Sequence, residues 1–153
     1  SIDFKNIIKN FGFKYAFGQH SGVIDETKDF YELPRYPINE KYGEIKRFKS
    51  LTKTLPFKYK KIYPEEKYLL QNTNPPDVKI EFYDNIANLK SVGCYSNEGN
   101  EWRQSNIKFE NSNTLIVKIA EKFIGERGRI NCSLRDPSGL WRWLCIQFVV
   151  SEK

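Results

Sequence analysis

The most regular alternation of apolar and polar residues lies in 129–150, where two apolar-rich stretches flank the tetrapeptide Asp-Pro-Ser-Gly. In the first stretch Ile130, Cys132 and Leu134 share one face, which is typical of a half-buried strand. The second stretch is apolar on both faces, as in a strand that is covered on both sides. Proline second and glycine fourth favour a type I turn. We therefore expect a β-hairpin whose second strand is central in its sheet and is covered outside by a second layer or a ligand.

The same period of two residues recurs upstream of this hairpin. Four further short strands are expected at 78–82, 92–96, 107–109 and 115–119. Turn-forming segments rich in Asn, Asp and Gly separate them. Six strands at spacings of roughly ten residues are typical of an antiparallel β-sandwich. The sequence therefore predicts a sandwich at 77–153, preceded by a polar, proline-rich boundary.

The first forty residues follow a different pattern. Apolar residues recur at helical spacing at Phe4, Ile7, Ile8 and Phe11. Ser1 or Asp3 can cap this helix, and a glycine follows its last apolar residue. A short strand is expected at 14–17. One helix and one strand are too small a unit to stand alone, so we expect the part of the sheet that covers the helix to lie upstream. The fold class is therefore α+β, with a short α/β remnant at 1–42.

The segment between these parts is strongly basic. It holds nine Lys or Arg and three Glu within 41–67, a difference of six that equals the net charge of +6 for the whole chain. A second amphipathic helix is expected at about 42–56, and we assign 43–76 to a basic helix and linker. The charge has two readings: a solvated helix face, or a surface that binds nucleic acid or an anionic glycan.

Composition narrows the class of protein. Hydrophobic residues make up 39% of the chain and aromatic residues 15%, which favours a folded domain. No apolar run is long enough to span a membrane, and no signal peptide is present, so the sequence specifies no compartment. The chain lacks Met altogether, which is compatible with a fragment of a longer protein. Cys94, Cys132 and Cys145 are expected to be buried free thiols, although Cys94 and Cys132 could form a bridge in an exported parent.

Candidate functional residues cluster in two places. Gly18 to Gly22 encloses Gln19, His20 and Ser21 just past a strand, where α/β folds keep their sites. His20 is the only histidine, so it cannot form a metal site by itself. It is either a site residue or a structural loop histidine. Arg35 lies between two prolines that hold it extended, poised either to bind an anion or to form an ordinary salt bridge.

The three tryptophans are the other candidates. Trp102, Trp141 and Trp143 could present flat apolar faces to sugar rings. Trp141 and Trp143 share one face of the expected strand because they are two residues apart. The alternative is that the tryptophans belong to the core or cover the second face of the sheet.

The ordered segments FGFKYAFGQHSGVI and ELPRYPINEKYG resemble the last part of the catalytic domain in bacterial polysaccharide deacetylases. The segments NPPDVKIEF, CYSNEG, ERGRINCSL and GLWRWLCIQFV resemble the β-rich C-terminal extension of a subgroup of these proteins. The resemblance covers most of the chain. It implies that 1–42 closes a distorted (β/α) barrel, with Gly18 to Gly22 at the barrel mouth and Arg35 near the place of an arginine close to the catalytic base.

The resemblance also implies a hydrolase that removes N-acetyl groups from amino sugars. A divalent metal, usually zinc, would be held by one Asp and two His, with a second Asp as base. Those motifs lie upstream of every residue in this chain, so we expect no metal site in it and no activity from it in isolation. The expected partners are the catalytic segment and a polysaccharide. The late Leu-x-His motif of the family is absent, and whether His20 replaces it is open. A carbohydrate-binding module without catalysis is the alternative function.

Overall fold

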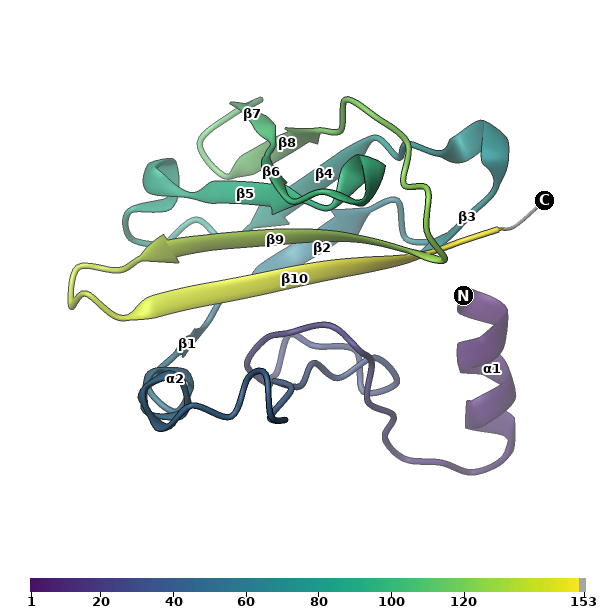
Figure 1. The fold of residues 1–153 in the computed structure, drawn as a ribbon, viewed down its shortest axis with the longest axis horizontal. Coiled ribbons are helices and arrows are strands. Elements are labelled where there is room, and N and C mark those ends of the chain that lie inside the picture. Colours follow the sequence, from purple (N-terminus) through teal and green to yellow (C-terminus); the bar gives the residue numbers. More distant parts are fainter. Residues whose placement is uncertain (152–153) are drawn as a thin grey trace.

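The computed structural model describes residues 1–151, which form a mixed α+β fold made mostly of strands in two facing sheets (Figure 1). One sheet has the order β1-β10-β9-β5-β6, with β3 also paired to β10, and the other has the order β2-β4-β8-β7. The strands are β1 (Leu55–Pro56), β2 (Tyr59–Tyr63), β3 (Tyr68–Leu69), β4 (Val78–Phe82), β5 (Gly93–Ser96), β6 (Arg103–Gln104), β7 (Asn106–Phe109), β8 (Thr114–Lys118), β9 (Arg127–Arg135) and β10 (Trp141–Val150). The helices are α1 (Ile2–Asn10), α2 (Ile45–Leu51) and the short 3₁₀ turns η1 (Gln71–Thr73), η2 (Leu89–Ser91) and η3 (Glu98–Asn100).

The predicted hairpin is confirmed and forms the centre of the larger sheet. β9 and β10 pair antiparallel from Trp141↔Arg135 to Val149↔Arg127. In the turn between them, the Gly139 amide donates to the Asp136 carbonyl at 2.9 Å, and Gly139 has φ +79°. Glycine tolerates this left-handed conformation without steric cost. All the other strands that the alternation predicted are present as β4, β5, β7 and β8, each within a few residues of its expected bounds.

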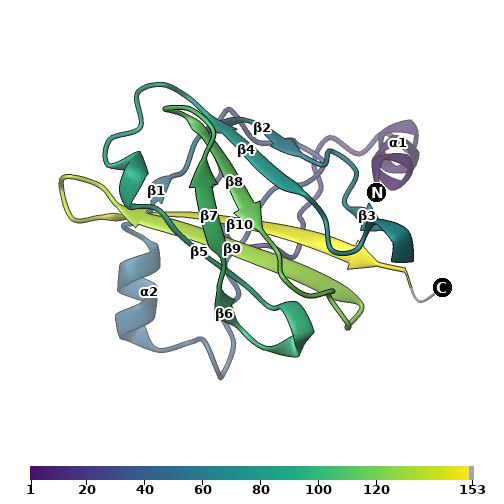
Figure 2. The ribbon, with the colours of Figure 1, turned by 90° about the horizontal axis from the view of Figure 1, so that it is seen from above.

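The inner faces of the two sheets make the core. Side chains such as Ile80, Phe82, Ile130 and Phe148 are completely buried between them. Phe82 stacks on Phe57 with ring centroids 4.8 Å apart. Seen from above, the strands of the two sheets run at an angle to each other (Figure 2). Burial of this continuous apolar layer is the main source of stability in such a fold.

The disulfide pairing corrects the expectation of free thiols. Cys94 on β5 and Cys132 on β9 are register partners and are joined by a disulfide in the core, whereas Cys145 is a buried free thiol as predicted. The bridge forms because antiparallel pairing places the two side chains directly opposite each other on the inner face.

The sheets begin earlier than the sequence indicated. β1, β2 and β3 lie within 43–76, the segment expected to be a basic helix and linker, and all three pair with strands of the sandwich. The expected helix at 42–56 is confined to Ile45–Leu51. The short strands escaped prediction because two residues show no periodicity, and because the lysines of β2 mask its alternation. The boundary segment is also tied to the sandwich, since the Asn74 side chain exchanges two hydrogen bonds with the Phe123 backbone.

The edge of β10 that faces away from β9 is capped by three short pieces. β1 pairs with Arg142 and Trp143, Gly22 forms a bridge with Leu144, and β3 pairs with Val149 and Val150. The N-terminal segment therefore reaches the sheet at Gly22. It also contacts β2 of the four-stranded sheet, where the Lys28 ammonium lies 4.4 Å from the centroid of the Tyr59 ring. Much of it lies below β10 in the view of Figure 1.

The helix α1 has the predicted cap, and its apolar side is uncovered within this chain, as the sequence indicated. The Ser1 hydroxyl accepts from the Phe4 amide, and Gly12 follows the helix with φ +79°. No residue of α1 is buried, and its predicted apolar stripe faces outward, with Phe4 62% exposed. Its polar edge makes the contacts instead: Lys5 donates to Asp29 at 2.9 Å and also to Glu32.

The strand expected at 14–17 is reduced to one bridge. Phe17 pairs with Leu33 in parallel, and the Gly18 amide donates to the Leu33 carbonyl at 2.8 Å. Two extended segments therefore run side by side in the same direction, but neither is a full strand. No sheet in the described residues extends this pair.

Candidate functional site

The segment Gly18 to Gly22 separates two hollows in the surface. Its backbone is fixed from both sides: the Cys145 amide donates to the Ser21 carbonyl at 3.1 Å, and the Arg35 amide donates to the His20 carbonyl at 3.0 Å. Successive side chains of an extended segment point in opposite directions. Gln19 and Ser21 accordingly line one hollow, and His20 lines the other.

The first hollow, which we call the arginine pocket, has a volume of about 470 Å³. Arg35, Arg47 and Arg129 line it, and no Asp or Glu is among the residues of its wall. These arginines come from three separate parts of the chain: the extended segment after Leu33, helix α2 and strand β9. The walls also carry three aromatic side chains, Tyr42, Trp102 and Trp143.

Neutral groups hold each arginine in place. Arg35 Nε donates to the Gly18 carbonyl at 3.0 Å, and Arg129 Nε donates to Gln147 Oε1 at 3.1 Å. Arg47 Nη1 donates to the carbonyls of Pro37 and Tyr42 at 3.0 and 2.9 Å. Within residues 1–151 none of the three forms an ion pair, so the ordinary salt bridge considered for Arg35 is not formed. Both terminal nitrogens of Arg35 and Arg129 are therefore available to a ligand.

Two side chains of the arginine pocket keep polar atoms without a partner. Asn131 Oδ1 and Trp143 Nε1 are buried, and no group of residues 1–151 hydrogen-bonds to them. The Trp143 ring is fixed by an edge-on contact with Tyr36 at a centroid distance of 6.2 Å. Buried polar atoms are nearly always paired in folded proteins, by water if not by protein. These two atoms make the wall of the pocket partly polar, and their hydrogen bonds are not supplied by residues 1–151.

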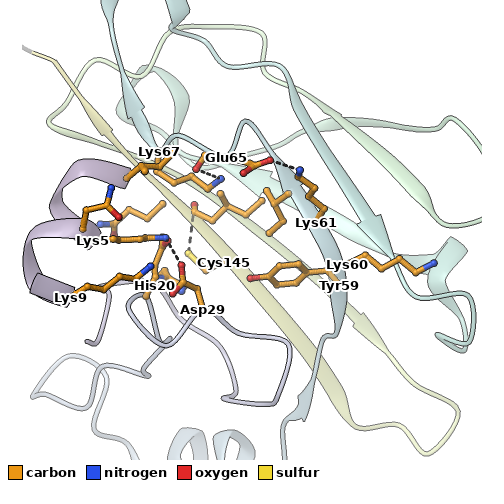
Figure 3. Close-up of a pocket in the computed structure, with 16 residues that line it drawn as sticks. Lys5, Lys9, His20, Asp29, Tyr59, Lys60, Lys61, Glu65, Lys67 and Cys145 are labelled. Carbon is orange, nitrogen blue, oxygen red and sulfur yellow. Dashed lines mark hydrogen bonds and ion pairs between the residues drawn. The ribbon is translucent and has the colours of Figure 1, made fainter. Parts of the chain in front are cut away.

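The second hollow, which we call the lysine pocket, lies between α1, β2 and β10 (Figure 3). It also measures about 470 Å³ and contains His20, Lys5, Tyr59, Lys67 and Cys145. In contrast to the arginine pocket, several of its cations form ion pairs: Lys5 with Asp29 and Glu32, Lys60 with Asp84, and Lys61 with Glu65.

Burial shifts the titration of the groups in the lysine pocket. It lowers the pKa of His20, since desolvation outweighs the nearby Glu32 carboxylate, and the imidazole is therefore neutral near pH 7. Burial also lowers the pKa of Lys67 to about 8. For Lys5 burial acts downward, but hydrogen bonds to Glu32 and Asp29 outweigh it and raise its pKa.

The lysine pocket does not assemble a nucleophile. Burial raises the pKa of Cys145 to about 11, which keeps it as an unreactive thiol at neutral pH. The His20 ring makes no hydrogen bond to another side chain in the described part of the chain. It does lie against Gly18, where a Cβ would approach His20 Nδ1 to 2.5 Å. Glycine at that position is therefore needed for the ring to occupy its place.

The structure brings together five of the seven site residues that the sequence indicated. Gln19, Ser21, Arg35, Trp102 and Trp143 all line the arginine pocket, although the two tryptophans are far in the sequence from the other three. None of the tryptophans belongs to the core, since each is at least partly exposed.

Two predicted residues lie apart from this group. His20 lines the lysine pocket, whereas Arg35 lines the arginine pocket. Trp141 lies outside both pockets, with the Arg135 guanidinium 4.4 Å from its ring centroid. Trp141 and Trp143 are on one face as predicted, but the loops of the N-terminal segment enclose only the position of Trp143.

Sequence reasoning did not identify Arg47, Arg129 and Asn131. A signal for the last two was present, because they alternate with the buried Ile130 and Cys132 and must share the outer face of β9. No periodicity or local motif in the sequence indicated Arg47. It lies on α2, and the bend between the extended segment and α2 brings it to the arginine pocket. The other cations of 41–67 are dispersed over α2, β2 and their loops, and Lys58, Lys60 and Lys61 have carboxylate partners.

No group of His, Cys, Asp and Glu side chains in residues 1–151 could hold a metal ion. None of the helices in that part of the chain is both long and apolar enough to cross a membrane. Comparison with protein-family models and with curated proteins found no match for this chain.

Proposed function

We propose that this chain is the C-terminal portion of a metal-dependent polysaccharide deacetylase, an enzyme that hydrolyses N-acetyl groups on amino sugars. In this proposal 1–42 closes a (β/α) barrel, and the two-sheet sandwich is an accessory domain. The resemblance of FGFKYAFGQHSGVI and ELPRYPINEKYG to that family motivates the proposal.

The observation that carries the proposal is the outward-facing apolar side of the N-terminal region. Among residues 1–151, thirteen of the twenty-one large exposed hydrophobic side chains lie within the first 48 residues. Folded monomers rarely leave a large apolar patch uncovered. A helix that makes its contacts through Lys5 and exposes Phe4, Ile7 and Phe11 needs a partner on its apolar side. Strands and helices of a barrel would supply that partner.

The parallel pairing at Phe17 and Leu33 is compatible with the proposal. Sheets made only of parallel strands belong almost entirely to α/β folds, although β1 and β3 of the sandwich also pair in parallel with β10. The polar segment Gly18 to Gly22 follows the first of these extended segments, in the place where α/β barrels keep their sites.

The side chains of this chain do not fit the metal of such an enzyme. His20 is its only histidine, and no metal-ligating group is formed within residues 1–151. The proposal therefore assigns the metal, most commonly zinc, to a segment that precedes Ser1. The Cys94–Cys132 disulfide is consistent with an exported protein, because disulfides persist in oxidising compartments.

The test is to express the complete reading frame that encodes this chain and to measure acetate released from N-acetylated chito-oligosaccharides. We expect acetate release that a chelator abolishes and zinc restores, and none from residues 1–153 alone. A reading frame that starts at this chain, or a longer product that releases no acetate from any N-acetylated glycan, would contradict the proposal.

The second candidate is a carbohydrate-binding module without catalysis. It is favoured by the arginine pocket, where Trp102 and Trp143 accompany the polar side chains of Gln19 and Ser21. Aromatic faces with a few polar groups are the usual walls of a sugar site. Binding of oligosaccharides by a reading-frame product that has no hydrolase activity would favour this candidate.

A further inference from the structure

We infer that the arginine pocket binds an acidic saccharide, one whose rings carry carboxylate or sulfate groups. The inference rests on the proposed function only in taking the ligand to be a glycan. Its other premises are the charge, size and walls of the pocket.

The positive charge of the pocket favours an anionic ligand. Arg35, Arg47 and Arg129 meet in one hollow without a neutralising carboxylate among its lining residues. Elsewhere in the described chain, cations such as Lys5, Lys79 and Arg103 have acidic partners within 4 Å. Three neighbouring guanidinium groups repel one another. An oxyanion would relieve that repulsion, and the terminal nitrogens of Arg35 and Arg129 would be free to bind it in the paired geometry that arginine forms with carboxylates.

The aromatic walls of the pocket favour a ligand that contains sugar rings. Trp102 is half exposed, and the Trp143 ring is held by its edge-on contact with Tyr36, so both contribute aromatic surface to the wall of the pocket. An aromatic face packs against the apolar face of a pyranose ring. Asn131 and the Trp143 indole add polar atoms that the protein leaves unpaired, which matches a ligand with many hydroxyl groups.

The shape of the pocket favours a saccharide over a nucleic acid. Single-stranded nucleic acids are bound along extended basic grooves that follow the backbone for several nucleotides. The arginine pocket is a hollow of about 470 Å³, which lies within the range of small-ligand sites and accommodates a few sugar rings. The lysines of β2 line the separate lysine pocket and are paired with Asp84 and Glu65, so they do not continue the arginine pocket as a groove.

The test is a binding titration of the full chain in a Trp141→Phe background, so that fluorescence reports Trp102 and Trp143. Three oligosaccharides of equal length serve as probes: oligoglucuronate, O-sulphated cello-oligosaccharide and neutral cello-oligosaccharide. A single-stranded oligonucleotide of equal charge is the fourth probe. We expect at least one of the two acidic saccharides to bind at least tenfold more tightly than the neutral one. The acidic saccharide that binds more tightly shows whether the pocket prefers carboxylate or sulfate groups.

The variants locate the binding. Arg129→Gln and Arg35→Gln should each weaken binding of the acidic saccharide at least tenfold, and Arg35→Lys should weaken it less than Arg35→Gln. The matched control is Arg135→Gln, which removes a β9 arginine outside the pocket and should change binding less than twofold. Circular dichroism checks that each variant is folded, and Arg47→Gln replaces any variant that is not.

Four results would overturn the inference: equal affinity for neutral and acidic saccharides, tighter binding of the oligonucleotide, equal losses in Arg135→Gln and Arg129→Gln, or failure of all probes to bind. The measurement requires no metal and no acetate release. Its failure is therefore distinguishable from failure of the deacetylase proposal, and either can stand without the other.

Discussion

The sandwich buries most of its apolar residues, whereas the N-terminal region exposes most of its large apolar side chains to solvent. Of the twenty buried hydrophobic residues, nineteen lie at Phe57 or later, and Leu33 is the exception. The first 48 residues nevertheless contain many large apolar side chains, and most of these face solvent. The sandwich therefore contains the interior that stabilises it, whereas the N-terminal region is held by polar contacts and by the edge of β10. A region of this kind is suited to form an interface.

The largest expected effect comes from deleting matched aromatic rings in the two regions. Phe82→Ala should lower the free energy of unfolding by about 3–5 kcal/mol, because the ring is fully buried against Phe57. Phe11→Ala should change it by less than about 0.5 kcal/mol, since Phe11 is 78% exposed. Urea denaturation of the isolated chain measures both. Equal losses in the two variants would show that the N-terminal region has a core of its own.

The disulfide should give the next largest effect, again in the sandwich. The double variant Cys94→Ser/Cys132→Ser opens a link between positions 38 residues apart and should lose about 2–4 kcal/mol. Reducing agent should destabilise the wild-type chain by a similar amount and leave the double variant unchanged. If the reductant has no effect on the wild-type midpoint, the two thiols are not bridged in solution.

Lys67 tests the contact between the two regions, because its side chain is half-buried at the lysine pocket. Its pKa falls from 10.5 to about 8 in the folded chain. The unfolded chain therefore binds the proton more tightly, and burial of the charge costs stability below pH 8. Lys67→Met should gain about 2 kcal/mol near pH 7, and the gain should disappear as the pH rises from 8 to 10.5. Cys145 and Tyr59 titrate in both proteins, so their effects cancel. A gain that does not vary with pH would argue against a buried ammonium.

His20 should give the smallest effect, on the acid side. Burial lowers its pKa from 6.5, so the unfolded chain takes up a proton before the folded chain does. Stability contributed by the neutral ring is present above pH 6.5 and is lost as the pH falls below it. His20→Gln should therefore show a shallower loss of stability than the wild type between pH 6.5 and 5 in urea titrations. Parallel curves would place the imidazole in solvent.

The contrast also explains which features the sequence could predict. Alternation in β4, β5, β9 and β10 is strong because one face of each strand is buried within the same domain. The cap at Ser1 and the turn at Asp136 were predictable because local hydrogen bonds determine them. The helix α1 was predicted correctly as an element. That its apolar side is uncovered within this chain was also predicted, but its contacts through Lys5 were not, because amphipathicity shows that a face will be covered and does not identify the partner.

The arginine pocket shows the same limit at the level of a site. Gln19, Ser21 and Arg35 stood out because glycines and prolines mark them locally. Arg47 and Arg129 join them through tertiary contacts between α2, β9 and the extended segment. Such convergence depends on the Gly22–Leu144 bridge, and a single isolated bridge has no periodic signature in a sequence.

The account depends on the claim that the apolar side of α1 is an interface with a preceding part of the same enzyme. Amide hydrogen exchange of Ile2–Asn10 tests it most directly, measured in residues 1–153 and in the product of the complete reading frame. We expect fast exchange in the isolated chain and at least hundredfold slower exchange in the longer product. Equal exchange rates in the two proteins, or a reading frame with nothing ahead of Ser1, would contradict the claim.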